Sequence, residues 1–384
     1  MFNLNKFYFK PKKKEILIYD SQGAEYISEY LNKNSFEILH TRKEKLSILI
    51  ILVCIFKLKF KKIYYIEEFI KYVYPKIIIT FIDNNIAFYN LHKITNAKTI
   101  FIQNGIRSCW NDVFYHILNK KLEITDKFKS QNFFVDYMLV WNNSVKNIYE
   151  KFIKGKFIIN GSFRSNLLKN KKVLTNVSPK VLLFISNFKN IAKSKIVGKE
   201  EYGKFIKNEK KLLFLLRDYC INNKYQIHVL GKNNSKKNNE RNYYNKFFSC
   251  VNGHKFIPSS INRNTYLETL KYKTILTIES SLGHEMLARK KRVAFMSTHE
   301  NIYPYNTLYF GWPNNEMNTG PFWTNKINYL EIKRLLDFVT NAEESKWIYA
   351  VNKYKKYLIN FEKKNNKLSE ILTKEKLSHC IKIT

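Results

Sequence analysis

Short apolar segments alternate with longer helical segments along most of the chain, and this alternation constrains the fold more than any other feature. In the first half, a helix is expected near residues 24–31 and strands at residues 15–19, 77–82, 99–103, 137–141 and 156–159. Nearly every strand segment is apolar on both faces, which is typical of a parallel sheet covered by helices on each side. The first half is therefore predicted to be a doubly wound α/β domain.

The alternation resumes after a polar, basic stretch that we interpret as an interdomain linker. Further strands are expected at residues 181–185, 226–230, 255–257, 274–278 and 292–296, and helices around 202–221, around 263–272 and from 282. The predicted organisation is a Rossmann-like domain (1–168), a linker (169–180), a second Rossmann-like domain (181–342) and a C-terminal helix and tail (343–384). Two such domains are expected to face a cleft, with ligands at the carboxyl ends of the strands.

The composition limits the partners of the chain. Its 384 residues, 45% of them hydrophobic, suffice for two domains with ordinary cores. The net charge is +36, but the basic residues comprise only nine Arg against 58 Lys. Because Arg is the usual reader of base edges, no nucleic-acid partner is expected. An anionic membrane surface, phosphate-bearing substrates and a compositional bias of the source each account for the charge, and the sequence leaves all three open.

Two apolar patterns bear on membrane association. The run Leu46–Phe56 has eleven residues, fewer than the roughly 20 that cross a bilayer, so we expect a buried helix or strand, with interfacial insertion as the alternative. Apolar residues at 347, 348, 351, 354, 358 and 361 predict a long closing helix, with a basic face toward anionic lipid as the alternative. The basic start lacks the apolar stretch of a secretory signal, so a cytoplasmic location is expected.

Three loops in the first half place polar residues after predicted strands. Asp83, one of seven Asp in the chain, is a candidate base or nucleophile, or alternatively the N-cap of the next helix. Gln103, Asn104 and Gly105 offer an amide pair to sugar hydroxyls, or form a plain turn. Arg164 is a candidate clamp for a carboxylate or phosphate, or a structural ion pair.

The loop after strand 274–278 carries the strongest signal. Ser280, Ser281 and Gly283 lie at the start of a helix, where free N–H groups and the helix dipole attract phosphate. Glu279 is placed to bind a ribose diol, and His284 either reaches a phosphate or packs. Ordinary helix capping also explains the two serines.

Other positions supplement this candidate site for a phosphate and a ribose. Ser186 follows strand 181–185, and Lys232, which suits a phosphate, follows strand 226–230. Aromatic, Gly and Pro residues at 309–313 and 320–324 suit the stacking of sugar rings or the packing of a core.

Missing motifs exclude several kinds of chemistry. The chain has no P-loop, no G-x-G-x-x-G, no G-x-S-x-G and no D-x-D, which argues against P-loop nucleotide hydrolysis, hydride transfer and serine hydrolysis. Five scattered Cys and eight dispersed His form no metal-binding pattern. No metal and no cofactor are expected.

The segments TFIDNN, FIQNG, NGSFRSN, IESSLGHEMLARKKRVAFMS and FGWPNN…GPFWTN resemble a family of bacterial surface-carbohydrate biosynthesis proteins with a two-domain GT-B glycosyltransferase architecture. This family is similar at a distance to capsule transferases that move 3-deoxy-octulosonic acid (Kdo) from its CMP derivative. The resemblance implies a metal-independent transfer in which the loop from Glu279 to Gly283 holds the nucleotide sugar and Asp83 is the nucleophile or base. Asn104 stands where the Kdo enzymes have a His, so the donor stays open.

The leading hypothesis is a glycosyltransferase that moves a sugar from a nucleotide-sugar donor to a cell-surface polysaccharide or its lipid-linked precursor. Its expected partners are the nucleotide sugar, a glycan or glycolipid acceptor and the anionic inner face of the cytoplasmic membrane, where the protein is expected to be peripheral. One alternative is a non-catalytic protein that binds polyanions, either nucleic acid or acidic glycan, and loses them in salt. The other is a different GT-B-like enzyme, such as a sugar-nucleotide epimerase or a polyol-phosphate transferase.

Overall fold

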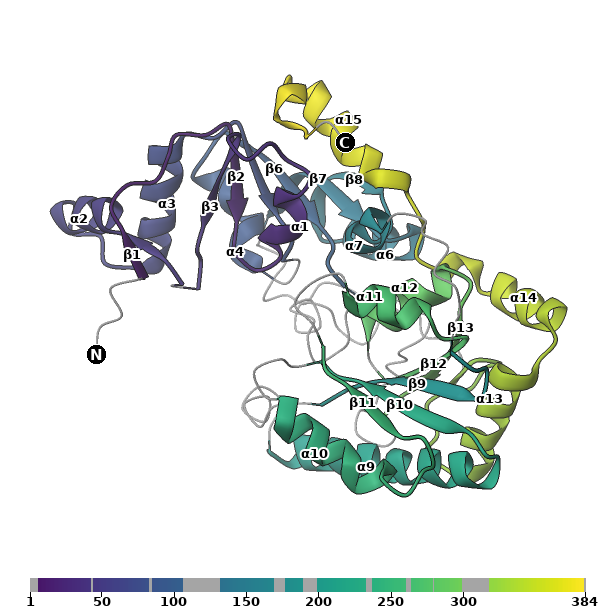
Figure 1. Ribbon diagram of the computed structural model, residues 1–384. Coiled ribbons are helices and arrows are strands. Elements are labelled where there is room, and N and C mark those ends of the chain that lie inside the picture. Colours follow the sequence, from purple (N-terminus) through teal and green to yellow (C-terminus); the bar gives the residue numbers. More distant parts are fainter. Residues whose placement is uncertain are drawn as a thin grey trace. The chain divides into compact units, whose positions relative to one another are not determined.

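The structure of the protein is a computed structural model, which describes residues 6–42, 44–82, 85–105, 132–168, 177–188, 199–232, 237–259, 264–278, 280–298 and 318–382 (Figure 1). The contacts divide the chain into two compact units. Unit 1 contains the described residues up to 105 together with 132–168 and 360–382, and unit 2 contains those between 177 and 359. No helix within the described ranges is both long and apolar enough to span a bilayer.

Unit 1 is built on a six-stranded sheet in which all neighbouring strands are parallel. In spatial order its strands are β3 (Phe36–Leu39), β2 (Ile16–Tyr19), β5 (Ile77–Thr80), β6 (Lys98–Ile102), β7 (Phe133–Val140) and β8 (Ile153–Ile159). The central strands β2 and β5 are buried along their whole length, as expected for a parallel sheet that is covered on both faces.

The helices of unit 1 include one from the far end of the chain. They are α1 (Ala24–Ser28), α2 (Ile48–Phe56), α3 (Lys62–Val73), α4 (Ile86–Tyr89), α6 (Asn143–Tyr149), α7 (Phe163–Leu167) and α15 (Asn366–Lys374), with 3-10 turns η2 (Leu91–Lys93), η5 (Lys363–Asn365) and η6 (Ser378–Cys380). A separate two-stranded sheet pairs β1 (Phe7–Tyr8) with β4 (Leu46–Ser47). Leu368 and Leu372 of α15 join Ile27 of α1 in one hydrophobic cluster, so the C-terminal segment completes the core of unit 1.

Unit 2 contains a second six-stranded parallel sheet. Its spatial order is β11 (Lys255–Ile257), β10 (Gln226–Leu230), β9 (Val181–Ile185), β12 (Thr274–Thr277), β13 (Arg292–Met296) and β14 (Trp323–Thr324). Its helices are α9 (Lys199–Asn222), α10 (Lys237–Phe248), α11 (Asn264–Leu270), α12 (Ser281–Ala288), α13 (Tyr329–Asn341) and α14 (Glu344–Lys353), followed by the 3-10 turn η4 (Lys355–Tyr357).

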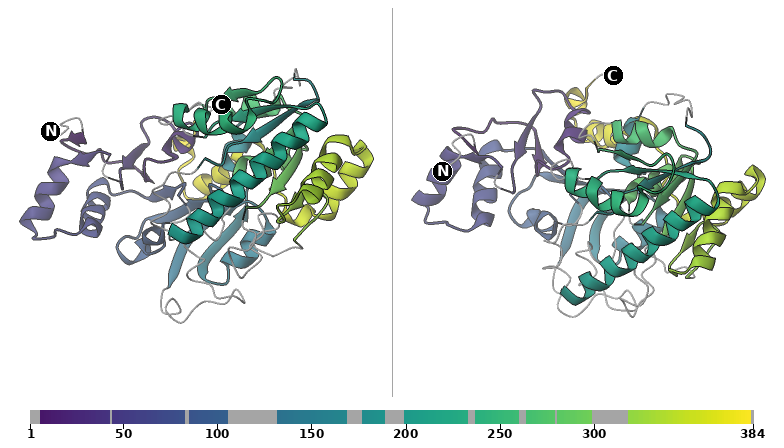
Figure 2. Two further views of the ribbon diagram at one scale, coloured as in Figure 1. Left: turned by 90° about the horizontal axis from the view of Figure 1, so that it is seen from below. Right: turned by 60° about the horizontal axis from the view of Figure 1, so that its bottom comes forward.

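Helices cover both faces of this second sheet. In Figure 1, α9 and α10 lie on one face, and α11 and α12 lie on the other. Figure 2 shows the long α9, in teal, running across the sheet. Two doubly wound α/β units with parallel sheets confirm the predicted fold class.

The expectation that the run Leu46–Phe56 is buried is wrong. Most of it forms the helix α2, but only Ile50 and Cys54 of that helix are buried. The opposite face of α2 is exposed, as are the residues that follow it. Hydrophobicity alone could not show that the neighbouring elements cover only one face of this helix.

The predicted long closing helix is also wrong, because α14 ends at Lys353 and only the short turn η4 follows it before residue 360. Residues 343–359 belong to unit 2, whereas the chain from residue 360 belongs to unit 1. There the backbone N–H of Asn360 donates to the carbonyl of Trp141 (3.0 Å), and Phe361 forms a β-bridge with Gly161. These contacts hold residues 360 and 361 outside any helix, although Phe361 continues the apolar spacing of the preceding residues.

Candidate functional site

The strand order of unit 2 contains a topological switch point between β9 and β12. From β9 the chain builds β10 and β11 on one side, and it then crosses to build β12, β13 and β14 on the other. Open α/β sheets bind ligands at the carboxyl ends of the strands that flank such a reversal. β9 and β12 are paired as far as Ile185 and Thr277, so Ser186 and the start of α12 lie at this edge.

Buried partners fix the loop after β9. The Ser186 hydroxyl donates to the carboxylate of Glu240 and lies 3.1 Å from the Tyr244 hydroxyl. That Tyr244 oxygen also accepts the backbone N–H of Asn187 (2.9 Å), and burial raises the pKa of the phenol well above its usual value. Ser186 is therefore a structural anchor of the loop, and the backbone of Asn187 is held in place with it.

Glu240 joins the loops after β9 and β10. Besides Ser186, its carboxylate accepts the backbone N–H of Lys232 at 2.8 Å, and the residue is fully buried in α10. The Lys232 side chain is exposed at this edge, as a phosphate contact requires. Glu240 was not among the residues predicted from the sequence, although an acidic residue in the first turn of a helix just after the Lys232 loop is a detectable signal.

Capping and close packing set the position of the α12 N-terminus. The Ser280 hydroxyl accepts the N–H of Leu282 (3.3 Å), and the Ser280 N–H donates to the hydroxyl of Thr277 (3.2 Å). A Cβ at position 283 would lie 2.5 Å from Thr277 Cγ2, so Gly283 allows α12 to pack closely on β12. Ser281, the first residue of the helix, is partly buried, and Glu279 lies outside the described residues.

His284 packs inside unit 2 and does not reach out to a phosphate. Its ring is buried, with its centroid 4.4 Å from that of Phe295. Burial lowers the pKa of His284 to about 3, so the imidazole is neutral at physiological pH. The packing alternative for this residue is the one that the structure supports.

The buried imidazole predicts a pH dependence of stability. Because the pKa of His284 is lower in the folded state, the unfolded chain binds one more proton between pH 3 and the ordinary value near 6.5. The contribution of His284 to the free energy of unfolding is complete above pH 6.5. It is lost as the pH falls through that window, by about 1.4 kcal/mol per pH unit. In urea titrations at pH 6 and pH 4, His284→Gln is expected to lose less stability on acidification than the wild type. An equal loss in the two proteins would contradict the assignment.

The strand order of unit 1 reverses between β2 and β5. The buried Asp20 follows β2, and its carboxylate accepts the Thr41 hydroxyl (2.7 Å), Arg42 Nε (3.1 Å) and the backbone N–H of Gln22 (2.9 Å). These bonds give Asp20 a structural role in the loop. The loop after β5 leads to Asp83, which, with residue 84, lies outside the described residues.

The N-cap of the helix that follows Asp83 is a different residue. The Asn85 side chain accepts the N–H of Ala87 at 3.1 Å and caps α4. The capping alternative for Asp83 is therefore wrong, and its role as a base or nucleophile stays a prediction.

Arg164 lies beside the loop that leads to Asp83. Its guanidinium carbon is 4.6 Å from the ring centroid of Tyr26 and 4.8 Å from that of Phe81, the residue that directly follows β5. Such cation–π contacts orient a guanidinium without neutralising its charge. The structure thus brings one predicted site residue, Arg164, to the β5 edge where another was expected.

The rest of the Arg164 loop holds the C-terminal segment. The side-chain Oδ1 of Asn365 accepts hydrogen bonds from the side-chain amides of Asn160 (3.1 Å) and Asn166 (2.7 Å), and the Asn365 Nδ2 donates to the backbone carbonyl of Phe163 (3.0 Å). Gly161 has a positive φ of 71°, and a Cβ there would lie 1.8 Å from the carbonyl oxygen of Asn360. Most of the NGSFRSN motif therefore forms a structural joint.

Gln103 is also occupied within the protein. Its Nε2 donates to the carbonyl of Gly105 (3.1 Å), and its Oε1 accepts the N–H of Trp141 (2.9 Å). The buried amide thus links the carboxyl ends of β6 and β7, and its proposed role toward sugar hydroxyls is not supported. Asn104, its partly buried neighbour, and the buried Gly105 remain at this edge.

The aromatic residues of the last predicted loop divide into two groups. Phe322 and Trp323 are buried and pack against Trp347 and Tyr354, so they belong to the core. Residues 309–313 lie outside the described residues.

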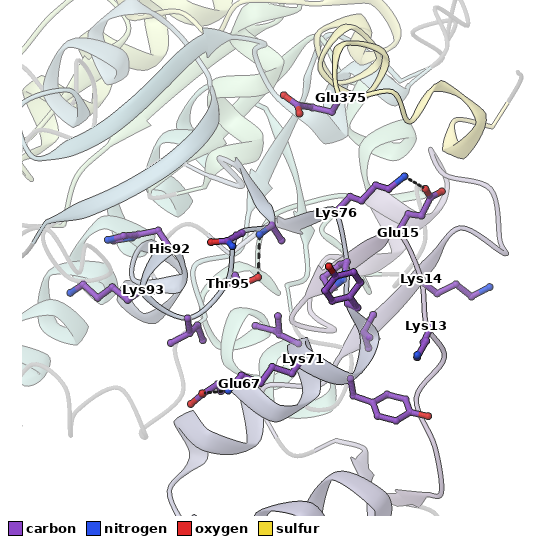
Figure 3. Close-up of a pocket in the computed structure, with 18 residues that line it drawn as sticks. Lys13, Lys14, Glu15, Glu67, Lys71, Lys76, His92, Lys93, Thr95 and Glu375 are labelled. Atoms are coloured by element: carbon purple, nitrogen blue, oxygen red, sulfur yellow. Dashed lines mark hydrogen bonds and ion pairs between the residues drawn. The ribbon is translucent and has the colours of Figure 1, made fainter.

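The opposite edge of the unit 1 sheet carries a basic pocket of about 1240 Å³ (Figure 3). Residues just before β2, β5 and β6 line it, together with Lys71 and Lys93. Two of its lysines are already paired, Lys76 with Glu15 (2.6 Å) and Lys71 with Glu67 (2.5 Å). Because it lies at the amino ends of the strands, this pocket is separate from the candidate site.

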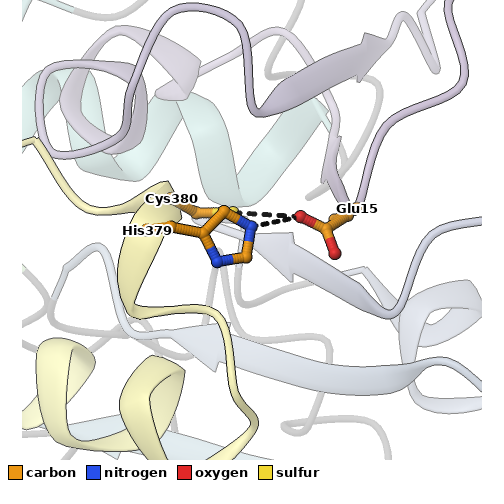
Figure 4. Close-up of side chains that lie close together, drawn as sticks. All are labelled: Glu15, His379 and Cys380. Carbon is orange, nitrogen blue, oxygen red and sulfur yellow. Dashed lines mark hydrogen bonds and ion pairs between the residues drawn. The ribbon is translucent and has the colours of Figure 1, made fainter.

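One group of potential metal ligands occurs among the described residues: Glu15, His379 and Cys380 (Figure 4). His379 Nε2 lies 2.5 Å from the Glu15 carboxylate, which also pairs with Lys76 and has a pKa lowered to about 2 by these hydrogen bonds. Burial raises the pKa of the Cys380 thiol to about 11, which disfavours the thiolate that a metal would need. The group is best explained as a hydrogen-bonded link between Glu15, just before β2, and the C-terminal segment.

Comparisons with known proteins agree with this architecture. Residues 100–376 match the sequence model of a family described as "putative O-antigen biosynthesis protein". None of the curated proteins matches the chain.

Solved structures with a similar fold include an epimerase and a polymerase. UDP-GlcNAc 2-epimerase of Methanocaldococcus jannaschii, in complex with UDP-GlcNAc and UDP, is 12% identical, with a TM-score of 0.53 over 94% of this chain and 99% of that chain. A variant of the wall teichoic acid polymerase TagF soaked with CDPG is 14% identical, with a TM-score of 0.51 over 95% of this chain and 89% of that chain. These similarities support the GT-B-like fold class.

Proposed function

Because the chain belongs to this family of O-antigen biosynthesis proteins, we propose that it is a glycosyltransferase that uses a nucleotide-sugar donor. The acceptor in this proposal is a cell-surface polysaccharide or its lipid-linked precursor. Transfer takes place at the inner face of the cytoplasmic membrane, where Lys side chains near the surface are attracted by about 1 kcal/mol each.

The observation that carries the proposal is the switch point of unit 2. There α12 begins, and the positive end of its dipole attracts phosphate; capping by Ser280 and the packing of Gly283 on β12 set the position of this helix end. Lys232 adds a positive charge from the loop after β10. A nucleoside diphosphate or monophosphate sugar fits this combination, and a CMP-Kdo-like donor is one candidate.

Unit 1 supplies the chemistry in this proposal. Asp83 acts as the base that takes a proton from the acceptor hydroxyl, or as the nucleophile. Arg164 orients an anionic group of a substrate, and Asn104 contributes a hydrogen bond to a sugar. The transfer in this proposal uses no metal. The negative charge of the leaving phosphate is stabilised by the positive ends of helix dipoles and by Lys and Arg side chains.

A specific observation favours a second candidate, a sugar-nucleotide epimerase. The M. jannaschii epimerase is matched over 99% of its own length, whereas the TagF polymerase is matched over 89%. The products distinguish the two activities, because an epimerase converts its nucleotide sugar without an acceptor. A transferase releases the nucleotide and lengthens an acceptor, and a polyol-phosphate transferase adds a phosphodiester.

The first experiment is a product analysis. Purified full-length protein is incubated with UDP-GlcNAc, CDP-glycerol and CMP-Kdo, each with and without membrane glycolipid acceptors, and products are identified by mass spectrometry. Acceptor-dependent sugar transfer supports the proposal, and acceptor-independent epimerisation replaces it with the second candidate. Binding to all polyanions that disappears in salt, with no turnover, would indicate the non-catalytic alternative.

A glycine pair tests the donor site. Gly283→Ala is expected to raise the donor KM about tenfold, because the new Cβ must push α12 away from Thr277 and displace its N–H groups. Gly203→Ala is the matched control, because a Cβ there has no atom within 4 Å. Equal donor KM values for the two variants would argue against a phosphate site at the start of α12.

A further inference from the structure

The helix α2 presents an apolar face to solvent. All nine of its residues are apolar, and within unit 1 it lies on the side of α3 away from the sheet (Figure 1). The exposed residues Ile48, Leu52, Ile55 and Phe56 are spaced to lie on one face. A helix that is apolar all round is normally enclosed in a core or in lipid, yet the described residues cover only the opposite face of α2.

The exposed apolar surface continues into the connection between α2 and α3. Phe56, Leu58 and Phe60 are 84%, 78% and 75% exposed, and Leu58 has a positive φ of 54° that a branched residue rarely adopts. Phe9 is 67% exposed, and its carbonyl accepts the N–H of Leu49 at the start of α2 (3.1 Å). We call Phe9, Leu52, Phe56, Leu58 and Phe60 the hairpin patch.

Lysine side chains accompany the hairpin patch. Lys57 and Lys59 pair with Glu68 of α3, at 2.7 and 3.5 Å. Lys61 and Lys62 are exposed beside Phe60, and Lys45 is exposed just before α2. The surface therefore combines projecting apolar side chains with a positive rim.

We propose that the hairpin patch inserts into the interface of an anionic lipid bilayer while the lysines contact the lipid phosphates. Apolar side chains that enter the boundary between headgroups and acyl chains, flanked by Lys, are the usual composition of such a surface. A second copy of the chain fits less well, because a two-fold contact through the patch would bring the two sets of lysines together.

This inference concerns a surface of unit 1 that is distinct from the strand edges of the candidate site. It explains how a transferase without a described membrane-spanning helix would meet a lipid-linked acceptor. It does not depend on the donor or on the reaction. If vesicle binding fails, the proposed transfer can still be observed with a water-soluble acceptor, so the two failures are distinguishable.

The test is sedimentation of full-length protein with vesicles. Wild type is expected to bind vesicles of phosphatidylglycerol and phosphatidylethanolamine and to bind pure phosphatidylcholine at least tenfold more weakly. Phe56→Ser/Leu58→Ser is expected to lower partitioning to the anionic vesicles at least tenfold, and Lys61→Glu/Lys62→Glu at least threefold. The matched control is Leu330→Ser/Tyr349→Ser, which replaces two residues of unit 2 that are 77% and 76% exposed, and it is expected to bind like wild type.

Three results would overturn the proposal. The first is that the wild type does not sediment with anionic vesicles, and the second is that Phe56→Ser/Leu58→Ser and its unit 2 control lose vesicle binding to the same extent. The third is that light scattering shows a dimer that Phe56→Ser/Leu58→Ser abolishes. Circular dichroism and thermal unfolding of every variant verify that these exposed substitutions leave the fold intact. As a positive readout, Phe60→Trp is expected to gain an emission blue-shift on addition of anionic vesicles.

Discussion

Asn365→Ala is expected to destabilise unit 1 by about 3 kcal/mol, because its fully buried side chain makes three hydrogen bonds. The substitution leaves the amides of Asn160 and Asn166 and the carbonyl of Phe163 without this partner in a buried environment. Asn365 also has a positive φ of 54°, which Asn tolerates better than Ala does. The amides of α15 are therefore expected to exchange with deuterium much faster, which mass spectrometry can measure segment by segment.

The neighbouring Asn366 provides the control for this prediction. It is exposed and begins α15, so Asn366→Ala is expected to change stability by no more than about 0.5 kcal/mol. If the α15 amides of the Asn365→Ala and Asn366→Ala variants exchange with deuterium at the same rate, the hydrogen bonds of Asn365 do not hold the C-terminal segment. The segment would then depend on the apolar contacts of Leu368 and Leu372 alone.

Much of the fold could be predicted because the central strands are buried on both faces. Segments such as β5 (Ile77–Thr80) and β9 (Val181–Ile185) are buried at every position and, apart from Thr80, are entirely apolar, which makes them visible in the sequence. β3 (Phe36–Leu39) lies at a sheet edge, is only partly buried and includes Glu37, so it was missed. Contacts far apart in the sequence, such as the attachment of residue 360 to unit 1, leave no periodic pattern.

The candidate site was predictable to a lesser degree. The rule that ligands bind after parallel strands predicts sites at the carboxyl ends of the strands, and Ser280, Gly283 and Arg164 lie at such edges. The rule does not say which polar side chains at an edge are used by the protein itself. Gln103 and Ser186 fall in this second group, because each binds partners that are fixed only by the folded chain.

His284 is another residue whose side chain is used by the protein itself, although a phosphate contact was the alternative to packing. His284 lies three residues after Ser281, so its sequence position suggested a phosphate contact. Its helical position instead turns the ring onto Phe295 of the neighbouring strand β13. Burial then lowers the pKa of His284 and removes the charge that a phosphate contact would need.

Asp83→Asn is expected to lower the turnover of the proposed transfer by a factor of about 100 to 10,000, the usual contribution of a general base. The loop after β5 lies at the switch point of unit 1, where Arg164 contacts Phe81, and Asn85 rather than Asp83 caps the next helix. An amide keeps the size and polarity of the side chain but cannot accept the proton. The donor KM should therefore stay within about twofold of wild type, because donor binding is assigned to unit 2.

The matched control is Asp218→Asn, which removes an exposed carboxylate of α9 that pairs with the adjacent Arg217 at 2.6 Å. This variant should keep wild-type turnover. A cellular readout is independent of the donor, because Asp83→Asn should fail to restore surface polysaccharide in a strain that lacks the protein, whereas Asp218→Asn should restore it. If both variants restore surface polysaccharide, Asp83 does not take part in the reaction. The proposed base or nucleophile would then have to be another residue at this edge of unit 1.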